Sequence, residues 1–339
     1  MNPTEHPDHI SRLISLPAAI PSSLAGPMER GRWLCEQLES GNILFFPENP
    51  FPLSSEDREF LLGLRQTSAQ FHKNIAYRPL EGRLTGLDRH EPPERAERLR
   101  EILQRFSDSV TQSLSAMLPA YAAGLRRDFA SFRPLEERGR PLRLRARNDL
   151  LHTDAFPTRP THGDRILRVF TNLNPTEPRV WHTSETFEAL AHRLARDAGL
   201  PRAQSRGLPR PARAGPVARF FAVIARSFRN LGFGIPHLRR SPYDQFMLRF
   251  HNFLKENRSF QETCTKQRWE FPPGSAWLVF SDMVSHAVLS GQFAVEQTFI
   301  VPRSAMVLPA KSPIAILETM CGYPLAERKG QELEPEPRA

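Results

Sequence analysis

Residues 150–173 read LLHTDAFPTRPTHGDRILRVFTNL, and this stretch decides the fold because a His-X-Asp motif comes shortly before an apolar, strand-like run. The run RILRVFTNL has the length and composition of a buried strand. Two later runs, SAWLVF and AVEQTFIVP, follow turns rich in proline and glycine. Short strands separated by such turns predict a β-sandwich or a barrel.

Helices are predicted upstream of these strands. The stretch GRWLCEQLESGNILFFP predicts a short helix, a turn and a buried strand at Ile43–Phe46. Ser55, followed by two acidic residues, has the pattern of a helix start. Between Pro93 and Phe129, apolar residues recur at steps of three and four, which predicts a long amphipathic helix.

The segment PLRLRARN alternates basic and apolar residues before the His-X-Asp motif. In a strand, Arg143, Arg145 and Arg147 would share one face, and the leucines would share the other. We therefore expect a strand with a strongly basic face at this position.

Residues 193–241 are rich in arginine, proline and glycine, which predicts an insertion between strands. Within the insertion, apolar residues between Val217 and Leu231 fall on one helical face, opposite several arginines. This pattern fits a helix lying on an anionic membrane surface, and it equally fits a helix packed on its own protein.

Composition excludes several classes of protein. With 339 residues, 40% hydrophobic and 24% charged, the chain can bury a core and is neither collagen-like nor wholly disordered. Three widely spaced cysteines support neither a disulfide framework nor a cysteine-based zinc site. Without a secretory signal or an apolar stretch of about 20 residues, we expect a cytoplasmic protein that does not span a membrane.

The net charge is +9, and arginine supplies nearly all of the positive charge. Such a surface attracts anions, so nucleic acid, anionic lipid and acidic sugars are candidate partners.

The His-X-Asp pattern can hold a metal, because residues two apart on a strand point the same way. Together with a distant histidine, they can occupy one face of an iron ion and leave three positions open. The pattern occurs three times. His6-Pro7-Asp8 lies in the proline-containing start of the chain, and His162-Gly163-Asp164 has the composition of a turn. His152-Thr153-Asp154 is favoured because it follows the predicted basic strand.

The second histidine of such a site is predicted to be His286, which lies between two strand-like runs. His182 and His251 are its competitors, the latter in a segment with a helical pattern.

The stretches LLHTDAFPTRPTHGDRILRVFTNLNP, SPYDQFMLRFHNFLKEN and FPPGSAWLVFSDMVSHAVLSGQFAVEQTFIVP resemble the bacterial 3-deoxy-D-manno-octulosonic acid (Kdo) hydroxylases. The resemblance implies an α+β protein with a double-stranded β-helix core, jelly-roll or cupin-like, and flanking helices. It also implies an Fe(II)- and 2-oxoglutarate-dependent dioxygenase, supported by ascorbate, that hydroxylates C3 of Kdo in lipopolysaccharide. His152, Asp154 and His286 match the metal positions of the family.

The co-substrate's far carboxylate calls for a basic residue, and many oxygenases carry an arginine about ten residues after the second histidine. Here those positions hold Ala294 to Gln297, so we predict Arg168 instead, with Arg165 as its nearest alternative. Thr171 and Gln297 are expected to support the co-substrate. Predicted substrate contacts are Arg143, Arg145, Arg147 and Arg159.

The predicted domain organisation is a flexible leader over residues 1–30, one oxygenase domain over 31–325 and a flexible tail over 326–339. The domain divides into helical support over 31–139, a β-helix core over 140–192 and 242–310, and the insertion. Expected partners are Kdo-containing lipid A and an anionic membrane surface, at the inner face of the inner membrane. No nucleic acid is expected, and a homo-oligomer is permitted. Two alternatives stay open: an oxygenase of the same fold acting on another lipid or on a protein, and a non-catalytic basic binding module.

Overall fold

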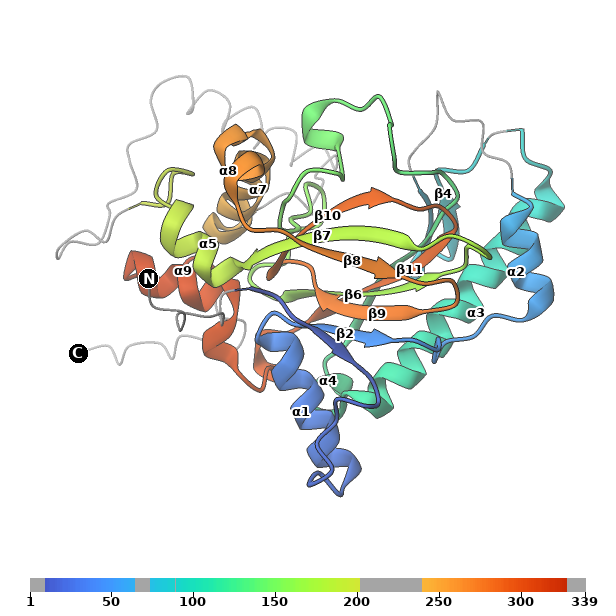
Figure 1. Cartoon of the computed structure of the whole chain (residues 1–339), viewed down its shortest axis with the longest axis horizontal. Coiled ribbons are helices and arrows are strands. Elements are labelled where there is room, and N and C mark those ends of the chain that lie inside the picture. The colour runs from blue at the N-terminus through green and yellow to red at the C-terminus, as the bar shows by residue number, and fades with distance from the viewer. Residues whose placement is uncertain (1–9, 65–73, 89, 202–239, 328–339) are drawn as a thin grey trace, which may run out of the picture.

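The computed structural model of the chain describes residues 10–64, 74–88, 90–201 and 240–327 (Figure 1). The motif at His6, the apolar helical face between Val217 and Leu231, and most of the tail lie outside these residues.

Two sheets form the centre of the molecule. The larger has the strand order β1-β2-β9-β6-β11-β5-β3-β4, and the smaller has the order β10-β7-β8. Every strand pair is antiparallel except β1 with β2. The strands are β1 (Leu13–Ser15), β2 (Ile43–Phe46), β3 (Ile75–Arg78), β4 (Arg83–Thr85), β5 (Arg126–Arg133), β6 (Arg165–Asn172), β7 (Arg179–Thr186), β8 (Gln267–Phe271), β9 (Ala276–Phe280), β10 (Val284–Ser290) and β11 (Ala294–Val301).

Helices cover the outer face and the ends of this core (Figure 1). They are α1 (Pro27–Glu39), α2 (Ser55–Leu62), α3 (Pro93–Met117), α4 (Pro119–Ala122), α5 (Phe187–Leu194), α7 (Pro242–Glu256), α8 (Arg258–Thr263) and α9 (Pro313–Cys321). The first helices pack on the larger sheet, with α1 against β2 and β9 and α3 against β5. This arrangement confirms the predicted α+β fold with a jelly-roll-like core.

Strand alternation divides the core into two apolar layers. On β6, Leu167 and Val169 belong to the large cluster that includes the helices, whereas Phe170 belongs to the smaller cluster with Trp181 and Trp277. Phe170 and Trp277 stack with their ring centroids 5.2 Å apart. Aromatic pairs of this kind contribute about 0.5–1.5 kcal/mol beyond their buried area. The smaller cluster therefore fills part of the space between the two sheets, and polar side chains occupy the rest of that space.

Local predictions upstream of the motif are confirmed in part. The helix before Ile43–Phe46, that strand itself and the helix starting at Ser55 are present. The long helix, however, ends at Met117, because Pro119 disfavours helical geometry at the residue before it. The end of the predicted helix, up to Phe129, belongs partly to β5. Residues 31–139 thus contribute β2 to β5 to the larger sheet, so they are more than a helical support.

The predicted basic strand at residues 141–148 is wrong. Residues Leu144–Ala146 form a 3₁₀ turn, and Leu144 is 46% exposed, so the alternating leucines have no core face to cover. Nor is the leader wholly separate, since Leu13–Ser15 pairs with β2. Within the described part of the chain, no helix has the length and apolar character needed to cross a membrane.

Candidate functional site

His152 and His286 are brought together by backbone pairing between two neighbouring extended segments. The amide of His152 donates to the carbonyl of His286 at 3.1 Å, and the reverse bond measures 2.9 Å. Residues paired in this way present their side chains on the same face. The two imidazole centroids lie 4.7 Å apart. Asp154 follows two residues later and is held by its amide, which donates to the carbonyl of Ser281 at 2.8 Å.

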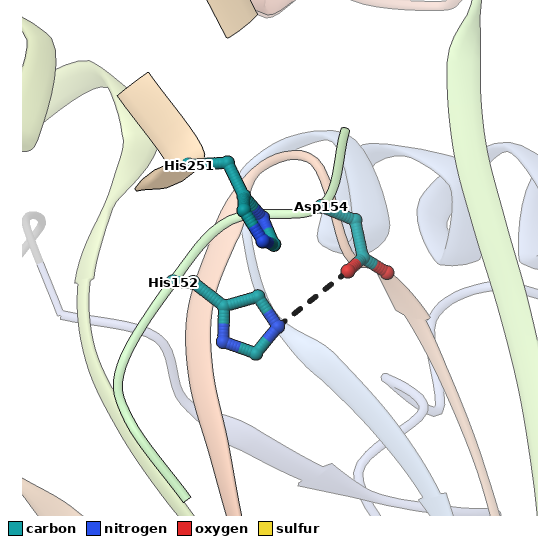
Figure 2. Close-up of side chains that lie close together, drawn as sticks. All are labelled: His152, Asp154 and His251. Atoms are coloured by element: carbon teal, nitrogen blue, oxygen red, sulfur yellow. Dashed lines mark ion pairs between the residues drawn. The ribbon is translucent and has the colours of Figure 1, made fainter. Parts of the chain in front are cut away.

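The hydrogen bonds of the two imidazoles leave the same ring nitrogen with a lone pair. Nδ1 of His152 lies 2.7 Å from the carbonyl of Leu150, and Nδ1 of His286 lies 2.8 Å from that of Val284. A carbonyl only accepts, so each Nδ1 carries the proton and each Nε2 is a free donor atom for a metal. Nε2 of His152 lies 3.7 Å from Oδ1 of Asp154 (Figure 2).

Burial and charge fix the protonation of this group. Burial is the main cause that lowers the pKa of His152 and of His286, so both imidazoles are neutral at pH 7. Burial alone would raise the pKa of Asp154, but the guanidinium of Arg168 holds it well below its usual range. Neutral imidazoles beside an ionised carboxylate are the donor set that divalent iron accepts.

A third imidazole reaches the same place from helix α7. Nδ1 of His251 lies 2.8 Å from the carbonyl of Thr153, and its ring packs edge-on against His152 at 4.8 Å between centroids. The candidate ligand atoms of His152, Asp154 and His251 all lie within 4.8 Å of one another (Figure 2). Burial lowers the pKa of His251 to about 4.

The other candidate histidines lie outside this group. His182 sits on β7 and points away from the core that holds its neighbour Trp181. His162 and Gly163 both have left-handed backbone, with φ of 54° and 94°, which confirms the predicted turn. Nδ1 of His162 lies 3.3 Å from Asp244, and Asp164 pairs with Arg126.

Arg168 lies directly beside the cluster on the inner face of β6. Its Nη1 donates to Oδ2 of Asp154 at 2.7 Å, and its Nε donates to Glu296 at 2.6 Å. Burial alone would raise the pKa of Glu296, but Arg168 and Arg133 lower it to about 2. The alternative, Arg165, is instead paired with Asp282 at 2.9 Å on the outer side of the strand, so of these two arginines only Arg168 faces the cluster.

Two further arginines on the inner faces escaped the sequence predictions. Arg133 on β5 contacts the same Glu296 carboxylate that binds Arg168. Arg179 on β7 is fully buried, and its Nη1 donates to the carbonyl of Gly291 at 2.9 Å. Its Nε and Nη2 have no hydrogen-bond partner among the described residues, and Nη2 lies 3.6 Å from Oε1 of Glu137, too far for a hydrogen bond. Two unpaired donors on a buried cation are costly unless a ligand satisfies them.

Trp181 connects these arginines to the histidines. Its indole stacks on the ring of His286 with a centroid distance of 5.2 Å and an angle of 19° between the rings. Trp181 and Arg179 are two residues apart on β7 and so share the inner face. Thr183 is the residue of β7 opposite His286, so Arg179 lies four residues along the strand from the metal-ligand candidates, on the same face as Trp181.

Thr171 and Gln297 are not brought to this group. In the pairing of β6 with β11, Arg168 lies opposite Thr298 and Phe170 lies opposite Glu296. Thr171 and Gln297 alternate with these residues along their strands and therefore face the opposite side. Gln297 donates to the carbonyl of Asp128 at 3.1 Å, and Thr171 contacts Asn49. Both side chains lie on the face that meets the helical layer.

Of the predicted substrate contacts, only Arg159 lies near the cluster. Its guanidinium packs over the rings of Phe129 and Phe156, 4.0 and 4.1 Å from their centroids, and pairs with Asp128. Phe156 is two residues from Asp154. Arg145 and Arg147 instead pair with Glu256 and Asp149 on or near the 3₁₀ turn, where Arg143 is also exposed.

Known proteins of one enzyme family are similar to this chain in sequence and in fold. A model of the 3-deoxy-D-manno-oct-2-ulosonic acid (Kdo) hydroxylase family matches residues 24–324. A crystal structure of the Kdo hydroxylase KdoO, a non-heme Fe(II) α-ketoglutarate-dependent dioxygenase, with α-ketoglutarate and Fe(III) bound, is 33% identical. That match covers 93% of this chain and 98% of KdoO, with a TM-score of 0.74.

A KdoO structure in complex with cobalt(II) has a TM-score of 0.76 at 33% identity, covering 95% of this chain and 99% of that one. A third KdoO structure, with succinate and Fe(III), is also 33% identical, with a TM-score of 0.74 over 95% of this chain and 99% of that one. No curated protein matches the sequence. From the family match and these structures, we conclude that the chain belongs to the Kdo hydroxylase family.

Proposed function

We propose that this protein hydroxylates C3 of the Kdo sugar in the inner core of lipid A, with Fe(II) held by His152, Asp154 and His286. The observation that carries the proposal is the backbone pairing of His152 with His286, which sets two metal-ready Nε2 atoms beside a buried carboxylate. His286 is favoured over His251 as the third ligand because strand register, rather than a helix-borne side chain alone, fixes its position.

The charges around the site suit a dianionic co-substrate. The guanidinium groups of Arg133, Arg168 and Arg179 are balanced by Asp154, Glu296 and Glu137, the last lying 3.6 Å from Arg179. Across these six groups the charges cancel, so Fe(II) would add two positive charges and 2-oxoglutarate two negative ones. Burying a charge without such compensation is strongly unfavourable.

The three arginines would divide the work of binding 2-oxoglutarate. The Nε and Nη2 donors of Arg179 make no hydrogen bond within the described part of the protein and suit the far carboxylate of the co-substrate. Arg168, which was predicted for this role from the sequence, is instead held by Asp154 and Glu296, and together with Arg133 it would supply the surrounding positive potential. When bound, Fe(II) with 2-oxoglutarate and dioxygen supplies the oxidising power, and the co-substrate leaves as succinate and carbon dioxide.

At the rim, Arg159 would bind an anionic group of the lipid substrate. Its side chain is 30% exposed and lies between two aromatic rings, so it is both ordered and accessible. The net charge of +9 supports attachment of the enzyme to an anionic membrane surface at the cytoplasmic face.

Mass spectrometry of Kdo-bearing lipid A tests the proposal. Purified protein with Fe(II), 2-oxoglutarate and ascorbate should add one oxygen to the Kdo fragment. The gain should vanish without 2-oxoglutarate and in His152→Ala, but persist in His162→Ala, which alters the other described His-X-Asp motif. Succinate without a modified Kdo fragment would retain the oxygenase and refute the substrate. The absence of both products would refute the proposed activity.

A further inference from the structure

We propose that Arg78 and Arg159 together bind the carboxylate of the Kdo sugar and thereby hold C3 toward the metal. The name 3-deoxy-D-manno-oct-2-ulosonic acid places a carboxyl group at C1, two bonds from the C3 methylene. A residue that binds this carboxylate therefore fixes the position of the reacting carbon. The inference rests on the proposed function, narrows the anionic group assigned to Arg159, and adds Arg78, which escaped the sequence predictions.

Arg78 reaches the inner face of the larger sheet from the end of β3. In the pairing of β3 with β5, Ala76 lies opposite Ser131. The hydroxyl of Ser131 donates to the buried carboxylate of Glu296, so Ser131 faces the inner side of the sheet. Ala76 shares that side because paired residues do. Arg78 comes two residues later on β3 and therefore faces the same way.

A β-bulge in β5 lies in the row of the sheet that contacts the metal-ligand candidates. Asp128 and Phe129 of β5 together lie opposite the single residue Thr298 of β11. Thr298 also lies opposite Arg168 on β6. Arg168 in turn donates to the carboxylate of Asp154. Bulges commonly redirect side chains next to active sites.

The guanidinium groups of both proposed carboxylate ligands contact the ring of Phe129. The guanidinium carbon of Arg159 lies 4.0 Å from the ring centroid, and that of Arg78 lies 4.8 Å from it. The two carbons are therefore less than about 9 Å apart. A charge-assisted hydrogen bond spans about 2.8 Å, so one carboxylate can accept from both guanidinium groups.

The carboxylates paired with these arginines do not balance their charge. Arg159 pairs with Asp128, whereas Glu81 is shared by Arg78 and Arg83, at 3.1 and 2.5 Å. The three arginines thus share two carboxylates. The excess positive charge favours an anionic ligand.

The donor atoms and the exposure of the pair also suit a ligand. Nε of Arg78 is buried and has no hydrogen-bond partner among the residues that the structure describes. Such a donor is costly unless a ligand satisfies it. Burial, with the positive charges of Arg168 and Arg78 nearby, lowers the pKa of Arg159 to about 10. The side chains of Arg78 and Arg159 are 31% and 30% exposed, so a substrate can reach both.

Proximity to the metal site favours the Kdo carboxylate over the phosphates of lipid A. Arg159 lies 4.1 Å from the ring centroid of Phe156, which is two residues from Asp154. A group two bonds from C3 must lie close to the metal when C3 reacts. The phosphates belong to other sugar rings and are under no such constraint.

Kinetics with three acceptors test this inference: Kdo-bearing lipid A, the same acceptor with its Kdo carboxyl groups converted to amides, and the same acceptor without its phosphates. For the unmodified acceptor, Arg78→Met should lower kcat/KM about 10- to 150-fold, because it removes hydrogen bonds to a charged group. The loss should persist without the phosphates. It should vanish with the amide, which wild type itself should use poorly.

Arg83→Met is the matched control, because it removes an exposed arginine that pairs with the same Glu81 carboxylate. Its kcat/KM should stay within about twofold of wild type. Thermal unfolding with cobalt(II) and 2-oxoglutarate bound verifies that each variant is folded. If Arg78→Met does not fold, Arg78→Lys, which keeps the charge but lacks the planar fork, should show a smaller loss with the same dependence on the acceptor.

Three results would overturn the inference alone. Arg78→Met could match Arg83→Met, which would show that Arg78 does not bind the substrate. An equal loss with the amide acceptor would indicate a merely structural role, and a loss that vanishes only without the phosphates would assign the arginines to phosphate. Failure of the wild-type protein to hydroxylate the unmodified acceptor would instead contradict the proposed function, and this inference with it.

Discussion

The substitution Arg179→Met should separate co-substrate binding from stability. Arg179 is fully buried, and two of its donor atoms, Nε and Nη2, make no hydrogen bond to a described residue, although Nη2 lies 3.6 Å from the carboxylate of Glu137. Each unsatisfied buried donor costs about 1–3 kcal/mol. Methionine has a similar reach and no donors, and Glu137 keeps Arg133 and Arg140 as neighbours. The free energy of unfolding without 2-oxoglutarate should therefore stay equal or rise by about 1–3 kcal/mol.

The same substitution should greatly weaken 2-oxoglutarate binding. Hydrogen bonds to a charged partner contribute about 1.5–3 kcal/mol each, and truncating one side of a buried charge pair costs about 2–5 kcal/mol. A loss of about 2–4 kcal/mol corresponds to an affinity roughly 30- to 700-fold lower. Metal affinity should be unaffected because Arg179 contacts none of the ligand candidates in the structure.

Thermal or denaturant unfolding with cobalt(II), with and without 2-oxoglutarate, measures both effects. Ligand that binds only the folded state raises stability by RT ln(1 + [L]/Kd), so the variant should lose this increment. Arg165→Met is the matched control: breaking its buried pair with Asp282 should cost about 3–5 kcal/mol without changing co-substrate affinity. The reasoning is refuted if Arg179→Met binds 2-oxoglutarate like wild type, or destabilises as much as Arg165→Met.

Three smaller predictions follow from the same buried network and from the cysteines. The carboxyl of Glu296 has a pKa of about 2, against an ordinary 4.5, so the unfolded state binds more protons between these values. Wild type should therefore lose stability as pH falls through this window, and acid denaturation curves of Glu296→Gln should be flatter; equal slopes would contradict this. Gly291→Ala should raise the KM for 2-oxoglutarate, because the residue has φ of 115° and an added Cβ would lie 2.9–3.1 Å from atoms of Arg179; an unchanged KM in steady-state assays would argue against the contact. Burial raises the pKa of Cys35 to about 12, so native-state thiol labelling should modify half-exposed Cys264 and spare Cys35; labelling of both would disprove the buried placement.

The metal-ligand candidates could be predicted from the sequence because their spacing along the chain determines much of their geometry. His152 and Asp154 are two residues apart, which places both on one face in any extended segment. His286 could be predicted as the second histidine because it lies between two strand-like runs of the sequence. The position of Arg168 beside the motif could be predicted for a similar reason, since it lies in a clearly apolar strand close to the motif, whereas its predicted role as the co-substrate arginine stays a prediction.

Residues whose orientation depends on how distant strands and helices pack could not be predicted from the sequence. Arg133 and Arg179 lie at strand ends, where arginine ordinarily faces solvent, and only the pairing of β5, β11 and β7 with their neighbours turns them inward. The placement of His251 depends on how α7 docks. Thr171 lies three residues from Arg168 on the same strand, and this odd separation was an available signal that the two side chains face opposite sides. Gln297 lies on β11, so the side that it faces depends on the strand register.

The alternation of basic and apolar residues over 141–148 led to the wrong prediction of a strand. A period of two predicts a strand only if one face is buried, and here Leu144 is exposed while Arg145 and Arg147 form their own ion pairs. Pro141 also lacks the amide needed for a ladder hydrogen bond. The alternation was therefore compatible with a short helical turn on the surface.

Anomalous diffraction from crystals grown without oxygen, with Fe(II) and 2-oxoglutarate, would test the central claim most directly. The account predicts one iron peak bonded to Nε2 of His152, Nε2 of His286 and the carboxylate of Asp154. The far carboxylate of 2-oxoglutarate should meet Nε and Nη2 of Arg179. An iron peak bonded to His251 in place of His286, or a co-substrate carboxylate distant from the buried arginines, would contradict it.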